Sequence, residues 1–114
     1  MDIETTKVLQ ALVKKLHDGL GPIVQRVTLF GSRARGGFSP DADLDVLVVL
    51  EPFSRQAKEY VYDVTADLSL EYDVVIAPVV KDASDYARMR TGGFLLAADI
   101  EREGITLWPI TQLR

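Results

Sequence analysis

The chain has 114 residues, of which 47% are hydrophobic and 26% are charged, and its formal net charge is −4. This length and composition predict one globular domain, because domains usually need roughly 50 to 250 residues each. The negative charge argues against broad nucleic-acid binding, which favours a basic face. With no cysteine and one histidine, disulfides and cysteine-type zinc sites are excluded, and only carboxylates could hold a metal ion.

The N-terminal residues and the lengths of the apolar runs indicate the cellular location of the protein. The first residues lack the charged-then-apolar pattern of a signal peptide, and no apolar run approaches the ~18 residues of a membrane span. We therefore expect a cytoplasmic protein that does not enter a membrane.

The first part of the chain predicts a helix, a strand and a loop. Apolar residues at helical spacing predict a helix over residues 5–18, which Gly21 helps to end. β-Branched residues predict a strand over 23–30 that runs directly into Gly31. Residues 33–40 then form a loop with room for one helical turn.

The middle of the chain predicts two more strands around a helix. The nearly continuous apolar run at 44–50 is typical of a central strand covered on both faces. An apolar stripe predicts a helix over 55–69, with Ser54 as its N-cap. A third strand is expected over 73–80, followed by a polar segment over 82–90.

The last part of the chain predicts a helix and a short strand. A Gly-Gly break at 92–93 precedes an apolar helix over 94–103, which Gly104 ends. Residues 105–108 are expected to add an edge strand. Residues 1–114 therefore predict a single α/β domain with strands separated by helices.

Acidic residues at alternate positions, Asp41, Asp43 and Asp45, lead into the central strand. Side chains at i and i+2 of a strand share one face, so Asp43 and Asp45 can aim their carboxylates at one point. Neighbouring carboxylates repel each other unless a cation lies between them, and oxygen ligands select a hard ion such as Mg²⁺. Asp73, at the start of the next expected strand, is the predicted third carboxylate, which a pair of metal ions usually needs.

A glycine turn lies between the first two expected strands. Gly31 lets the backbone turn sharply and approach a ligand without a Cβ in the way. Ser32 offers a hydroxyl and an N–H to phosphate oxygens, and Arg33 and Arg35 can contact a triphosphate or an acceptor. Either arginine could instead be an ordinary surface charge. The turn is neither a Walker A loop nor a dinucleotide-binding motif.

The run Gly31-Ser32-Arg33-Ala34-Arg35-Gly36, followed by Asp43-Leu44-Asp45 and later by Asp73, resembles the minimal nucleotidyltransferase (MNT) domains of the DNA polymerase β-like superfamily. The resemblance covers most of the chain and is greatest to the short MNT antitoxins encoded beside HEPN toxins. It implies the nucleotidyltransferase fold, an α+β fold with a small mixed sheet of three to four strands flanked by helices. It also implies that Asp43 and Asp45 are paired magnesium ligands, that Asp73 is the third acidic residue, and that Gly31 and Ser32 bind phosphate.

The resulting functional hypothesis is magnesium-dependent transfer of a nucleoside monophosphate, AMP from ATP, with two magnesium ions. In the antitoxin branch the resemblance implies transfer onto a tyrosine of the HEPN toxin, which would neutralise its RNase activity. One domain leaves no room for an acceptor-binding domain, which favours a partner protein as the acceptor. Two alternatives stay open: transfer to a small molecule such as an aminoglycoside, and a non-catalytic antitoxin that masks its toxin by contact alone.

Overall fold

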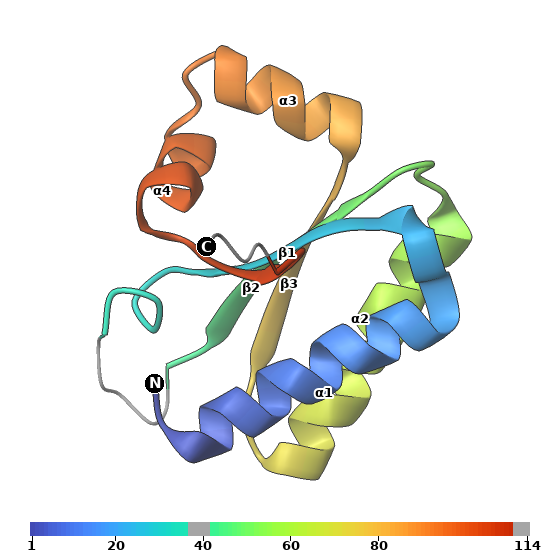
Figure 1. Ribbon diagram of the computed structural model, residues 1–114, viewed down its shortest axis with the longest axis vertical. Coiled ribbons are helices and arrows are strands. Elements are labelled where there is room, and N and C mark those ends of the chain that lie inside the picture. Colours follow the sequence, from blue (N-terminus) through green and yellow to red (C-terminus); the bar gives the residue numbers. More distant parts are fainter. Residues whose placement is uncertain (37–41, 111–114) are drawn as a thin grey trace.

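A four-stranded mixed sheet organises the computed structural model, which describes residues 1–36 and 42–110 (Figure 1). The strand order is β3-β2-β1-β4. The strands are β1 (Val24–Phe30), β2 (Leu44–Leu50), β3 (Ile76–Asp82) and β4 (Ile105–Trp108). β1 runs antiparallel to both β2 and β4, whereas β2 and β3 are parallel. The predicted α+β fold with a small mixed sheet is confirmed, as is the edge position of β4.

Helices cover both faces of the sheet (Figure 1). α1 (Ile3–Leu20) and α2 (Arg55–Tyr72) pack on one face, where they bury the larger core cluster, which includes Leu12, Leu44 and Leu68. α3 (Ala83–Thr91) and α4 (Leu95–Glu103) lie over the other face and bury a smaller cluster around Leu47 and Ile100. Because β2 contributes alternate residues to both clusters, it is covered on both faces as predicted.

Side-chain caps begin the two long helices. The Asp2 carboxylate accepts a hydrogen bond from the Thr5 N–H at 2.7 Å at the start of α1. The Ser54 hydroxyl accepts one from the Ala57 N–H at 3.0 Å at the start of α2, which confirms the predicted N-cap. A short 3-10 helix, η1 (Gly21–Ile23), joins α1 to β1. Across the described ranges, none of these helices combines the length and the apolar character needed to span a bilayer.

The polar segment at residues 82–90, for which the sequence predicted no helix, forms helix α3 (Ala83–Thr91). Asp82 caps the helix by accepting a hydrogen bond from the Ser84 N–H at 2.9 Å, and Asp85 pairs with Arg88 one turn apart. Tyr86 is the buried residue of this helix. One buried side chain makes no apolar stripe, which is why hydrophobic spacing failed to predict α3.

The third strand begins at Ile76 and not at Asp73, so the predicted start of this strand is wrong. α2 continues to Tyr72, and Asp73 is its C-cap in the left-handed conformation, with φ 55° and ψ 47°. The Asp73 N–H donates to the Ser69 carbonyl, and the Ile76 N–H donates to the Ser69 hydroxyl at 3.0 Å. These bonds satisfy the end of the helix and set where β3 starts.

Candidate functional site

Asp43 and Asp45 lie together at the start of β2. Asp45 is the second residue of the strand, paired with Phe30 of β1, and is half-buried, whereas Asp43 precedes the strand and is exposed. Burial raises the pKa of Asp45, and the negative charge of Asp43 raises it further. The two carboxylates are therefore close enough to interact, as their alternate spacing predicted.

Gly31, directly after the neighbouring strand β1, lies against Asp45. It follows the last residue of β1 and has φ 80°, a backbone conformation that favours glycine. A Cβ built on Gly31 would fall on Oδ2 of Asp45. The glycine is thus required twice, once by the backbone angle and once by the close approach of the carboxylate.

Residues 31–36 form one helical turn at the end of β1, which agrees with the turn expected in the loop at 33–40, whose residues 37–40 lie outside the described ranges. The Ala34 N–H donates to the Gly31 carbonyl at 3.1 Å, and the Gly36 N–H donates to the Arg33 carbonyl at 3.3 Å. Ser32 is exposed in this turn, directly after the glycine that contacts Asp45. The predicted phosphate-binding turn and the acidic pair therefore meet at one end of the β1–β2 hairpin.

Arg33 and Arg35 both have partners within the chain. Arg33 donates from Nη2 to the Thr5 hydroxyl at 2.6 Å and from Nη1 to the Ala42 carbonyl at 3.3 Å. Arg35 forms an ion pair with Glu103 of α4, with 3.2 Å between Nη1 and Oε1. Sequence reasoning missed these contacts, because nothing in the local pattern reports residues so distant in the chain. The predicted contacts of Arg33 and Arg35 with nucleotide stay predictions.

Asp73 is not brought to the acidic pair. It is exposed at the end of α2, and Ala77 is the β3 residue in register with Asp45. Within residues 1–36 and 42–110, no three histidine or acidic residues gather to hold a metal ion. The role of Asp73 as a third ligand stays a prediction, and Asp41 lies outside the described residues.

The acidic pair suits one hard cation. Among the described residues, none of the ion pairs involves Asp43 or Asp45. Burial raises the pKa of Asp45, and the charge of Asp43 raises it further, so a bound cation would offset both effects. Two carboxylates match the ligand set that Mg²⁺ usually takes from a protein, with substrate phosphates and water completing the shell.

A polar cluster fixes α3 and α4 over the sheet. Glu101 of α4 accepts hydrogen bonds at Oε2 from Arg26 of β1, at 2.6 Å, and from the Tyr86 hydroxyl of α3, at 2.8 Å. Burial and the bond to Glu101 raise the pKa of Tyr86 to about 12. Burial also raises the pKa of Glu101, but the bonds from Arg26 and Tyr86 and the charges of Arg26 and Arg90 outweigh it and lower the net value. This cluster holds the layer that covers the sheet face to which Asp45 belongs.

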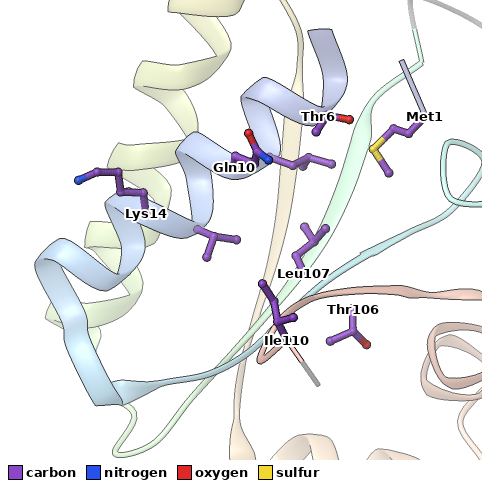
Figure 2. A pocket seen from close by; sticks show the side chains of 9 residues that line it. Met1, Thr6, Gln10, Lys14, Thr106, Leu107 and Ile110 are labelled. Carbon is purple, nitrogen blue, oxygen red and sulfur yellow. The ribbon is translucent and has the colours of Figure 1, made fainter. Parts of the chain in front are cut away.

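A cavity of about 430 Å³ lies between α1 and β4 (Figure 2). Its walls are mostly apolar, and they include none of the residues that the sequence predicted for the site. The lining residues are Met1, Thr6, Leu9, Gln10, Val13, Lys14, Thr106, Leu107 and Ile110. The cavity is therefore separate from the acidic pair and its glycine turn.

Comparison with known proteins finds similarity to nucleotidyltransferases. Residues 7–92 match the family model of the nucleotidyltransferase domain. A candidate protein adenylyltransferase of Methanocaldococcus jannaschii, MJ0141, is 29% identical over 79 residues, which cover 68% of this chain and 80% of that protein.

Solved structures share the same fold. A candidate minimal nucleotidyltransferase superposes with a TM-score of 0.61 at 28% identity, covering 94% of this chain and 97% of the other. A Shewanella oneidensis complex of a tri-AMPylated HEPN toxin with an MNT antitoxin matches with a TM-score of 0.56 at 20% identity, covering 92% of this chain and 72% of the matched one. At 20% identity this second likeness concerns the fold alone.

Proposed function

The chain belongs to the nucleotidyltransferase domain family, and from this premise we propose that it transfers AMP from ATP onto a hydroxyl of a partner protein, with Asp43 and Asp45 as its metal-binding residues. The observation that carries the proposal is the contact between Gly31 and Asp45. It joins a glycine turn suited to phosphate and a pair of carboxylates suited to magnesium at one end of a hairpin. A nucleotidyltransferase needs these two features side by side.

Asp43 and Asp45 would hold Mg²⁺, which when bound stabilises negative charge on the phosphates and on the leaving pyrophosphate. Ser32 is exposed in the turn, so its hydroxyl and N–H are available to donate to phosphate oxygens. Gly31 keeps the backbone free of a side chain where the phosphates approach. With the α-phosphorus so placed, the acceptor hydroxyl attacks it in line and releases its proton to solvent. The bond from its oxygen to the α-phosphorus of AMP forms as the bond from that phosphorus to pyrophosphate breaks, and pyrophosphate leaves.

A protein acceptor is supported by two of the likenesses. The relative from M. jannaschii is named for protein adenylylation, and the S. oneidensis complex contains an AMPylated HEPN toxin beside an MNT antitoxin. We therefore propose a HEPN-type toxin as the partner and a tyrosine of that toxin as the acceptor. Arg33, Arg35 and Asp73 are not needed for this assignment.

The test is transfer of label from ATP labelled at the α-phosphate, in the presence of Mg²⁺, to the HEPN-type protein encoded beside this chain's gene. Label is expected on a tyrosine of that protein with the wild type, and none with Asp43→Asn/Asp45→Asn. Asp63→Asn, which changes an exposed carboxylate on α2, is the matched control and should keep full activity.

Two results would replace this proposal with an alternative. Equal inhibition of the toxin by the wild type and by Asp43→Asn/Asp45→Asn, without label, would identify an antitoxin that acts by binding. Label on an aminoglycoside and not on the protein would identify a small-molecule transferase.

A further inference from the structure

Arg33 connects three parts of the chain that meet at the candidate site. It belongs to the helical turn after β1, its Nη2 donates to the Thr5 hydroxyl in the first turns of α1, and its Nη1 donates to the carbonyl of Ala42. Ala42 immediately precedes Asp43. The guanidinium therefore bridges from the glycine turn to the residue before the first acid of the pair.

Asp43 needs such support because burial does not hold it. Its side chain is exposed, so packing does not fix its position. The residues on either side are both tied by hydrogen bonds: the Leu44 N–H donates to the Val75 carbonyl at 2.8 Å, and the Ala42 carbonyl accepts from Arg33. Asp43 is thus held from both sides along the backbone.

The anchor of this bridge is Thr5. Thr5 is 5% exposed, although it is polar, and its N–H is already satisfied by the Asp2 carboxylate. Its hydroxyl accepts the bond from Arg33 at 2.6 Å, which gives a buried polar group its partner. Hydrogen bonds from Thr5 lower the pKa of Asp2, and the nearby charge of Arg33 lowers it further. α1 therefore presents a capped, buried acceptor to the guanidinium.

We propose that Arg33 is a positioning residue, which holds Asp43 in place for the metal ion by linking the Ala42 carbonyl to Thr5, and that it does not bind the nucleotide. The inference rests on the proposed function for the role of Asp43. Two donors of the planar guanidinium, on Nη1 and Nη2, are directed at protein oxygens, an arrangement that suits the fork of arginine. Lysine carries its three donors on one nitrogen and lacks the two separate nitrogens of this fork, so we expect Arg33→Lys to lose at least one of the two bonds.

The test compares variants at both ends of the bridge. Arg33→Met removes the donors and keeps side-chain length, Thr5→Val removes the acceptor and keeps the shape, and Thr5→Ser restores the hydroxyl. Thr6→Val is the matched control, because the Thr6 hydroxyl bonds only to the Asp2 carbonyl at 2.9 Å among the described residues. Thermal unfolding confirms that each variant folds. Should Thr5→Val fail to fold, Arg33→Met and Arg33→Lys carry the test.

Two readouts are measured: the Kd for Mn²⁺ without nucleotide or acceptor, and kcat and KM of AMP transfer. Arg33→Met and Thr5→Val should each weaken Mn²⁺ binding and lower kcat by roughly 10-fold, the scale for residues that orient metal ligands, with KM for ATP within about twofold. The double variant should be no worse than either single one. Thr5→Ser and Thr6→Val should behave as the wild type.

Two outcomes would overturn the assignment. A raised KM for ATP in Arg33→Met, with Thr5→Val unaffected, would make Arg33 a nucleotide ligand. Unchanged Mn²⁺ affinity in both variants would remove the positioning role. A wild type that binds Mn²⁺, loses this affinity in both variants and transfers nothing would overturn the proposed function and leave the positioning role standing.

Discussion

The Asp45 carboxylate lies against the α-carbon of Gly31, across the pairing of β1 with β2. The acid that is half-buried and the glycine that turns the backbone are therefore parts of one arrangement. A change at either residue acts on the other, and this coupling can be measured.

Replacing Gly31 by alanine should abolish transfer while the protein still folds. The new Cβ would displace the Asp45 carboxylate, so we expect activity to fall by roughly 100-fold or more, the scale for losing a group that stabilises charge in the transition state. Gly36→Ala is the matched control, because Gly36 has φ 82° but open space around a new Cβ. Both variants should lose about 1 kcal/mol from the left-handed backbone angle. Equal losses of activity in the two would refute the role of the contact.

Asparagine at position 45 should stabilise the protein in the absence of metal. Burial and the charge of Asp43 raise the pKa of Asp45 above its ordinary value of 3.8, so the folded state disfavours the charged form. The contribution of protonated Asp45 to the folding free energy is fully present below pH 3.8. It is lost as the pH rises through the pKa of Asp45 in the folded state. At neutral pH, Asp45→Asn should therefore raise the Tm of the metal-free protein.

Magnesium should reverse the order of the two melting temperatures, so that the wild type becomes more stable than Asp45→Asn. Binding to the folded state stabilises it by mass action, so Mg²⁺ should raise the Tm of the wild type but not that of Asp45→Asn. Calorimetric melting with Mg²⁺ and with a chelator measures both effects, and Asp63→Asn should respond as the wild type. The same Mg²⁺-dependent rise in Asp45→Asn would show that the ion binds elsewhere.

Substitutions at Asp73 separate capping from metal binding. Its left-handed conformation, φ 55°, favours glycine, so Asp73→Gly should keep or slightly raise stability, whereas Asp73→Ala should lower it by about 1 kcal/mol. Because Asp73 forms no metal-binding group with Asp43 and Asp45 among the described residues, kcat should stay within about twofold in both variants. Chemical denaturation and initial rates test this. A collapse of kcat in a fully folded Asp73→Gly would restore Asp73 as the third metal ligand.

The burial of Tyr86 and its hydrogen bond to Glu101 predict a loss of stability in alkali. The pKa of Tyr86 is raised from 10.0 to about 12, so the unfolded chain loses the proton first as the pH rises. The contribution of protonated Tyr86 to the folding free energy is complete below pH 10 and is lost as the pH rises through about 12. Tyr86→Phe should cost about 1 kcal/mol at neutral pH and remove this alkaline loss. Denaturant titrations on both sides of pH 10 test it. Tyr62→Phe on α2 should keep the wild-type pH dependence, and an equal loss in Tyr86→Phe would contradict the assignment.

Local patterns predicted much of this fold. The spacing of apolar residues predicted α1 and α2, and the continuous apolar run predicted β2 with its observed bounds. The polar helix α3 was missed, because its Asp82 cap and single buried tyrosine produce no periodic signal. The predicted start of β3 was wrong, because an aspartate in the left-handed conformation at the end of a helix has no reliable signature in sequence.

For the candidate site, too, the sequence predicted the local features and missed the contacts between distant segments. The alternation of Asp43 and Asp45 predicted their shared position, because the two-residue period of a strand is a local rule. The bond from Arg33 to Thr5 depends on how α1 packs against the turn, which no short window of sequence contains. The roles of these residues in catalysis stay proposals for the experiments above.

The β1–β2 hairpin also has a consequence for the order in which the chain folds. Gly31 and Asp45 are separated by a short stretch of the chain. Closing this one loop brings them together at a small cost in conformational entropy. The layer of α3 and α4 and the edge strand β4 come from the last part of the chain. During synthesis the candidate site can therefore assemble first, and the helices that cover its face of the sheet arrive afterwards.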